Sequence, residues 1–370
     1  MRIVAVLVGS AALSVAACGT EATPERWLVY DQVTPGTYGL TPVVLETISS
    51  PRRISGEVAR LRGGGEVRVA TEEPQTADEY ARSLEIVGDA PVDLDFFVAD
   101  GVGVATDFDG LMMLTVYHHL EATQRFFASH GVGLNTVRAM DVYFRAGMDA
   151  SPLLPVPAFT DNAAYAFTLD AFILPPRLML AAGVPLFANR GVVAHEYAHM
   201  VFNRLVLHDR RAPLYLLDAW ETPAVNEMRS LDEALSDLFA SLATGDPDFM
   251  APSFVGYANT LDRGLAVERH YDQELATSVR GDDIGGYDPY VLGSVVASSL
   301  WALRELEDDA TLAQTVLAAE RALDGDVQRE AIIAPFVNAT LSAWPSATRA
   351  EACAVLRTRL EAIAEEITCP

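Results

Sequence analysis

The sequence Val192-Val193-Ala194-His195-Glu196-Tyr197-Ala198-His199-Met200-Val201-Phe202 organises the central part of this chain. Its apolar residues lie on nearly all sides, which predicts a buried helix over 189–207. His195 and His199 are four residues apart, so both imidazoles project from one face and can bind a single tetrahedral ion. Glu196 lies beside them, where its carboxylate can take a proton from a bound water. A pair of hydrogen-bonded core histidines is the alternative, but three buried polar side chains are costly without a ligand.

A third ligand is expected from Ser230-Leu231-Asp232-Glu233-Ala234-Leu235-Ser236-Asp237, at the start of a helix predicted over 231–243. Glu233 and Asp237 share the face opposite the leucines, so one can bind the ion while the other accepts a hydrogen bond from a ligand imidazole. A capping box of Ser230 and Glu233 is the alternative, and two carboxylates on a face that should be buried weigh against it. Weaker alternative ligands are Asp218, Glu221 and Glu227.

These residues resemble the gluzincin metallopeptidases, especially the thermolysin and fungalysin families. Residues 195–199 followed by Asn203-Arg204-Leu205 are similar to the fungalysin helix, and residues 233–237 are similar to the thermolysin glutamate helix. The resemblance covers roughly residues 109–306. It implies one Zn²⁺ held by His195, His199 and Glu233, with Glu196 as general base and Asp237 orienting the first histidine.

The same resemblance implies substrate contacts. Asn162-Ala163, with Tyr165 before a strand, resembles the thermolysin edge segment that holds the substrate backbone. Where the family places a catalytic histidine before a helix, this chain has Asp288-Pro289-Tyr290, so Tyr290 is expected to donate to the developing oxyanion. Alternatives for this role are Tyr287, Tyr197 and His270.

Beyond these motifs the chain changes from strand patterns to helix patterns. Short apolar or alternating runs between Pro, Gly and acidic clusters predict strands from Thr23 to about Asp100. A helix is predicted over 109–129. Later strands are predicted over 140–145 and 165–174, and later helices over 290–306, 310–323, 329–341 and 347–367.

This order predicts an α+β protein, a two-lobed zincin-like metallopeptidase. We expect a β-rich region over 18–108, an N-terminal catalytic lobe over 109–207 that ends in the H-E-x-x-H helix, and a helical C-terminal lobe over 208–370. The C-terminal lobe would carry the third zinc ligand.

The N-terminus is similar to a bacterial lipoprotein signal. Met1-Arg2 precedes an apolar run over 3–17 that is too short to span a bilayer comfortably. Val15-Ala16-Ala17-Cys18 resembles a lipobox, which implies a signal peptide over 1–17 and lipidation of Cys18; an ordinary signal is the alternative. Gly19 replaces the Asp of an inner-membrane retention signal, so we expect an exported lipoprotein at the outer membrane that meets lipid only through its anchor.

The other two cysteines are Cys353 and Cys369. An oxidising compartment permits a disulfide between them. The helix predicted over 347–367 would instead hold them about 24 Å apart, so a bond requires that helix to end early.

The 370 residues include 26 basic and 51 acidic ones, a net charge of −25, and every basic residue is Arg. Such a charge repels nucleic acids. Ca²⁺ is a weakly supported second cofactor, because Asp107-Phe108-Asp109-Gly110 and Asp324-Gly325-Asp326 are acidic turns of a kind common without any ion. His118 and His119 are adjacent on a helix, so we expect them to point apart and to be partly exposed.

Together these patterns predict a zinc-dependent peptidase that acts on a peptide or protein substrate. An aminopeptidase-like gluzincin is one alternative, because a tyrosine donor resembles that branch. A non-catalytic zinc-binding surface lipoprotein is the other, and it has no need of Glu196.

Overall fold

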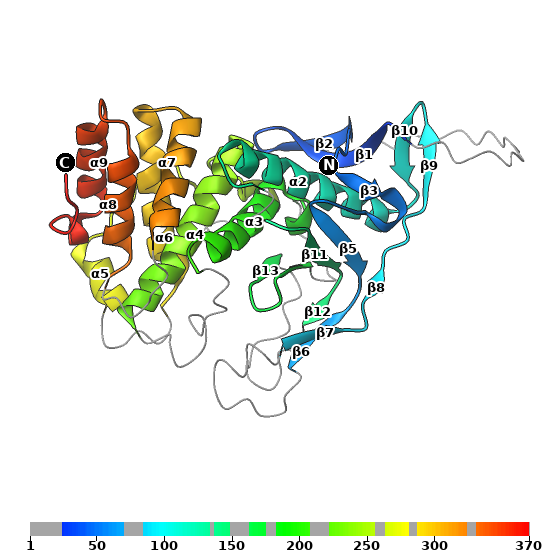
Figure 1. Ribbon diagram of the computed structural model, residues 1–370, viewed down its shortest axis with the longest axis horizontal. Helices are drawn as coiled ribbons and strands as arrows, with labels where there is room; N and C mark the ends of the chain where they lie inside the picture. The colour runs from blue at the N-terminus through cyan, green and yellow to red at the C-terminus, as the bar shows by residue number, and fades with distance from the viewer. Residues whose placement is uncertain are drawn as a thin grey trace, which may run out of the picture.

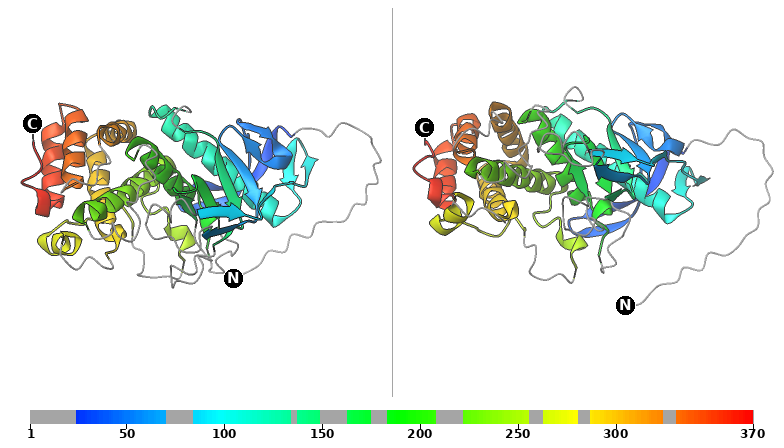
Figure 2. Two further views of the ribbon diagram at one scale, coloured as in Figure 1. Left: turned by 60° about the horizontal axis from the view of Figure 1, so that its bottom comes forward. Right: turned by 90° about the horizontal axis from the view of Figure 1, so that it is seen from below.

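The computed structural model describes residues 24–69, 84–133, 137–148, 163–174, 183–207, 222–255, 263–280, 287–323 and 331–369. The protein is mixed α+β, as predicted from the sequence. The strands gather at one end of the molecule and helices α5 to α9 at the other (Figures 1 and 2). Cys18 and Asn162 lie outside the described residues, as does the predicted signal peptide.

One sheet contains four strands in the order β2-β1-β10-β9. β1 pairs antiparallel with β2 and parallel with β10, which pairs antiparallel with β9. Their bounds are β1 (Arg26–Thr34), β2 (Thr37–Val43), β9 (Phe96–Ala99) and β10 (Val102–Ala105).

A second sheet contains seven strands in the order β13-β14-β11-β5-β4-β3, with β8 beside β5. Their bounds are β3 (Ile48–Ser50), β4 (Ser55–Gly56), β5 (Ala59–Gly63), β8 (Ala90–Pro91), β11 (Met140–Phe144), β13 (Ala164–Ala166) and β14 (Ala171–Leu174). The single strand predicted over 165–174 is therefore wrong. The backbone turns at Asp170, whose φ is 51°, and β13 folds back antiparallel on β14.

A small third sheet contains β12 (Gly147–Met148), β6 (Glu66–Val69) and β7 (Leu84–Val87).

Three long helices cross the middle of the molecule: α2 (Phe108–Ser129), α3 (Arg190–Leu205) and α4 (Pro223–Thr244). The predictions for α2 and α3 agree with the structure to within two residues at each end. α4 begins eight residues earlier than predicted, because the Thr222 side chain caps it and Pro223 occupies its first turn. Ser230 consequently lies inside the helix, and the capping-box alternative is excluded.

The remaining helices pack beyond α4, and α4 and α6 make the most extensive of these contacts. They are α5 (Gln273–Arg280), α6 (Pro289–Trp301), α7 (Asp309–Ala322), α8 (Ile333–Ala343) and α9 (Arg349–Arg359). α5 was not predicted, because its eight residues are too few to show a helical period clearly. Within the described ranges, no helix is both long and apolar enough to cross a bilayer.

Cys353 and Cys369 form a disulfide, with Cα atoms 5.7 Å apart. The helix predicted over 347–367 is wrong at its C-terminal end, because α9 stops at Arg359. The carbonyl of Arg359 accepts a hydrogen bond from the Tyr271 amide, and the Tyr271 carbonyl accepts one from Ala362. These contacts replace helical hydrogen bonds, so the chain turns back and brings the two cysteines together.

Candidate metal centre

The helix that carries the H-E-x-x-H motif is fixed at its start. The Asn189 side chain accepts hydrogen bonds from the Gly191 and Val192 amides, at 2.9 and 3.4 Å, and donates to the Phe249 carbonyl at 2.8 Å. Because one side chain both caps α3 and attaches it to a neighbouring segment, the orientation of the helix is set within its first turn.

Three predicted ligands meet at one point. Nε2 of His195 and Nε2 of His199 are 3.0 Å apart, and Oε2 of Glu233 lies 3.4 Å from the first and 3.8 Å from the second. Ligand atoms around a four-coordinate divalent ion with bonds of about 2.0–2.1 Å lie about 3.3–3.4 Å from one another. The three observed separations bracket that value. His195, His199 and Glu233 are thus positioned to bind one metal ion.

Carboxylates on α4 lie behind both histidines. Nδ1 of His199 is hydrogen-bonded to Asp232 at 2.8 Å, and Nδ1 of His195 lies 3.0 Å from Asp237, without the alignment of a regular hydrogen bond. Each contact turns the Nε2 atom of that ring toward the shared point. Asp237 was predicted for this position. Asp232 was not, because the sequence suggested a helix start there and a first-turn aspartate is expected at such a start.

The histidines and carboxylates of this cluster shift one another's pKa values. Burial alone would lower the pKa of His199, but Asp232 and Glu233 raise it to about 10. Burial alone would raise the pKa of Glu233, but the two histidines lower it to about 2. The carboxylate of Glu233 is therefore ionised at neutral pH, as a metal ligand must be.

Arg263 completes the group, and sequence reasoning missed it. Its guanidinium donates to Asp237 at 2.9 and 2.6 Å and to Oε2 of Glu233 at 3.2 Å. Its Cζ lies 4.3 Å from the centre of the Tyr290 ring. Arg263 lies 26 residues after Asp237 in a segment without regular structure. No spacing in the sequence indicates that it reaches the site.

The remaining acid of the motif is held from the sheet. Oε2 of Glu196 accepts a hydrogen bond from the backbone N–H of Tyr165 at 2.7 Å, so β13 fixes the carboxylate. Burial raises the pKa of Glu196. Ala163, which precedes β13, is buried and lines the same cavity. The side chain of Glu196 is thus fixed within this cavity.

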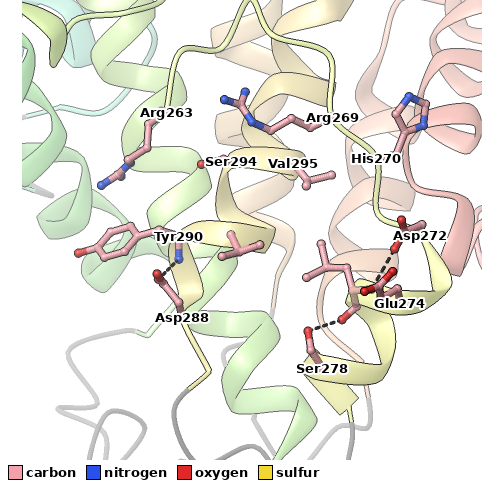
Figure 3. Close-up of a pocket in the computed structure, with 12 residues that line it drawn as sticks. Arg263, Arg269, His270, Asp272, Glu274, Ser278, Asp288, Tyr290, Ser294 and Val295 are labelled. Atoms are coloured by element: carbon pink, nitrogen blue, oxygen red, sulfur yellow. Dashed lines mark hydrogen bonds between the residues drawn. The ribbon is translucent and has the colours of Figure 1, made fainter. Parts of the chain in front are cut away.

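The cavity has a volume of about 400 Å³, and Tyr290 in the first turn of α6 lines it together with the three predicted ligands. The charge of Glu233, and then burial, raise the pKa of Tyr290, so its hydroxyl stays protonated and can donate. A neighbouring cavity of about 670 Å³ shares Arg263 and Tyr290 with it (Figure 3). The side chains of Arg263 and Tyr290 therefore line both cavities.

The alternative donors lie elsewhere. Tyr197 packs against Phe127 in the core, the Tyr287 hydroxyl is hydrogen-bonded to Ser230, and His270 lies between Glu268 and Glu361. Of the described residues proposed for the oxyanion role, Tyr290 alone lines the metal cavity.

The alternative ligand Glu227 is also excluded from the centre. Its carboxylate accepts hydrogen bonds from the Ile332 and Ile333 amides at 2.8 and 3.1 Å, so it holds the start of α8. Asp218 and Glu221 lie outside the described residues. Asp107, in one of the two acidic turns considered for Ca²⁺, caps α2 by accepting from the Gly110 amide at 2.7 Å; the other turn, 324–326, is not described.

The chain matches no protein-family model and no curated protein sequence. What the centre can do chemically thus follows from its own residues: two imidazoles and a carboxylate for a cation, with a buried acid and a phenol facing the same space.

Proposed function

We propose that this protein is a two-lobed, zincin-like peptidase that hydrolyses peptide bonds with one catalytic Zn²⁺. The observation that carries the proposal is the convergence of His195, His199 and Glu233 beside the carboxylate of Glu196. Two histidines and one glutamate, with a fourth position left for water or substrate, are a typical ligand set of catalytic zinc.

Each residue then has a chemical role. His195, His199 and Glu233 would hold the ion, which when bound acidifies water and polarises the scissile carbonyl. Glu196 takes the proton of the attacking water and later delivers it to the leaving amine. Tyr290 donates a hydrogen bond to the developing oxyanion, and Asp232 and Asp237 keep the two imidazoles oriented.

The surroundings of Glu196 favour a peptide as the substrate. β13 is the last strand of its sheet in the described residues, and it lines the cavity with Ala164 and Tyr165. An extended peptide can add to such an edge by main-chain hydrogen bonds. Ala163 keeps its predicted role in substrate binding within this proposal, and so does Asn162. Apolar lining residues that could receive a substrate side chain are Leu186, Val192, Met250 and Phe254.

The proposal is tested by the variant Glu196→Gln, which removes a base and keeps the ligands. We expect zinc content equal to wild type and at least about 10²-fold slower hydrolysis of casein. Glu85→Gln is the matched control, because Glu85 is half exposed and its ion pair with Arg68 is a surface pair. Wild-type hydrolysis by Glu196→Gln would overturn the mechanism.

An aminopeptidase-like activity is the second candidate, and the position of Tyr290 favours it because a tyrosine donor resembles that branch of the gluzincins. Internally labelled casein is cleaved by an endopeptidase, whereas an aminopeptidase releases free amino acids from it. A non-catalytic zinc-binding protein would not need the carboxylate of Glu196 as a base in this cavity.

We also propose that the protein is an outer-membrane lipoprotein anchored through Cys18. The support is the lipobox-like sequence alone. Cys18→Ser should move the protein from the membrane fraction to the soluble fraction of a bacterial host, because the acyl chains supply the membrane affinity. Unchanged fractionation would exclude the anchor.

A further inference from the structure

A second group of potential ligands lies on β1 and α2. Oδ2 of Asp31 is 3.1 Å from Nε2 of His118, and Oδ1 of Asp31 is 3.7 Å from Nδ1 of His119. The side chains of Asp31, His118 and His119 are only 14%, 8% and 0% exposed. The expectation that the two histidines are partly exposed and point apart is wrong, because β1 packs along α2 and places Asp31 within reach of both rings.

Two buried nitrogen atoms in this group have no hydrogen-bond partner among the described residues: Nδ1 of His118 and Nδ1 of His119. Nε2 of His119 lies 3.2 Å from the Ala188 carbonyl, which can only accept, so that nitrogen carries the proton. Nδ1 of His119 then presents its lone pair toward Asp31. A histidine whose other N–H donates to a carbonyl is in the state that metal ligands adopt.

We propose that Asp31, His118 and His119 form a second divalent-metal site that binds Zn²⁺ and has a structural role. Each of the three residues offers one ligand atom, an imidazole nitrogen or a carboxylate oxygen, and these atoms lie within 4.8 Å of one another. Nε2 of His118 faces Oδ2 of Asp31 at 3.1 Å and Nδ1 of His119 faces Oδ1 at 3.7 Å, so both rings meet the same carboxylate. Two imidazoles and one carboxylate suit zinc-type ions rather than Ca²⁺.

The position of this site gives its role. His119 contacts Ala188, directly before the Asn189 cap of α3, and the hydroxyl of Tyr38 on β2 donates to the Asn189 side chain at 2.9 Å. An ion here joins β1 and α2 to the start of the H-E-x-x-H helix.

Zinc stoichiometry tests the proposal without any activity assay. We expect about two zinc ions per chain in wild type, about one in His195→Ala/His199→Ala, about one in Asp31→Asn, and none in the combined variant. Asp31→Asn keeps the shape of the side chain and removes its charge. His130→Ala, at the C-cap of the same helix and outside the group, is the matched control and should keep both ions.

A second measurement covers the case in which Asp31→Asn fails to fold. Added Zn²⁺ should raise the Tm of His195→Ala/His199→Ala by several degrees, because an ion that binds only the folded state stabilises it. Absence of both zinc and this shift in that variant would overturn the second site. If wild type binds one ion that Asp31→Asn alone removes, the second site stands and the catalytic centre proposed above fails.

Discussion

Arg263 forms two hydrogen bonds with Asp237, from Nε to Oδ2 at 2.9 Å and from Nη2 to Oδ1 at 2.6 Å. Asp237 in turn lies 3.0 Å from Nδ1 of His195, so an arginine far from the motif fixes the carboxylate beside a candidate metal ligand. The same guanidinium touches Glu233 and packs on Tyr290. One side chain thereby couples a ligand, an orienting acid and the expected oxyanion donor.

Loss of an orienting carboxylate should weaken metal binding. We expect Asp232→Asn and Asp237→Asn each to reduce zinc affinity about 10–100-fold, because the ligand imidazole loses the neighbouring negative charge that orients it and raises its basicity. Competition with a chelator of known affinity measures the change. Asp141→Asn, which breaks an exposed ion pair with Arg60, is the control. Unaltered affinity in Asp232→Asn would remove Asp232 from the centre.

Removal of Arg263 should destabilise the fold. Arg263→Leu leaves Asp237 buried without its cation, and breaking such a buried pair costs about 3–5 kcal/mol of the free energy of unfolding. Arg60→Leu breaks the exposed pair with Asp141 and should cost about 1 kcal/mol or less. Urea unfolding of both variants gives the comparison. Similar losses in the two variants would show that the Arg263 pair behaves as a surface contact.

Tyr290→Phe should lower kcat about 10²–10³-fold with little change in KM or zinc content. The ring, which packs on Arg263, is kept, and only the hydroxyl that donates in the transition state is lost. Steady-state kinetics on a peptide substrate, with Tyr287→Phe as the matched control, decide the point. A wild-type kcat in Tyr290→Phe would show that another group donates the hydrogen bond to the oxyanion.

Glu320 in α7 should make stability pH-dependent. It is fully buried, its carboxyl oxygens have no partner among the described residues, and burial, then the charge of Asp232, raise its pKa well above the usual value. The pKa of Glu320 is therefore higher in the folded state than in the unfolded state. The contribution of Glu320 to stability is therefore complete below the unfolded pKa and is lost as pH rises toward the folded pKa.

Glu320→Gln removes this titration. Near pH 4 we expect the free energy of unfolding of the variant to differ little from that of wild type. Near pH 8 we expect the variant to be about 1–3 kcal/mol more stable, because wild type must then either hold a proton on Glu320 or bury its charge. Urea midpoints across this range measure the effect. Glu366→Gln, at the surface, is the control. A parallel pH profile for wild type and Glu320→Gln would show that Glu320 is solvated.

The chain order of strands and helices could be predicted because local periodicity carries it. The prediction failed at the end of α9, where a tertiary contact overrides local preference, and at the start of α4, where a local cap lies outside the apolar periodic run. The helix expected to continue past Arg359 is ended by the segment around Tyr271, and the early start of α4 depends on a single cap at Thr222. Neither contact leaves a periodic signal in the sequence.

By itself, the sequence placed His195 and His199 on one helix face with Glu196 beside them, because helical spacing alone does so and a buried face demands a partner for each charge; the choice of Glu233 over Asp237 as the third candidate ligand came from the resemblance to the gluzincins. Only the tertiary structure decided which groups surround them. Asp232 and Arg263 reach the centre, and Asp31 meets His118 and His119 through the packing of β1 on α2. Such contacts join residues that are distant in the chain, and they exist only after burial has fixed how the elements lie against one another.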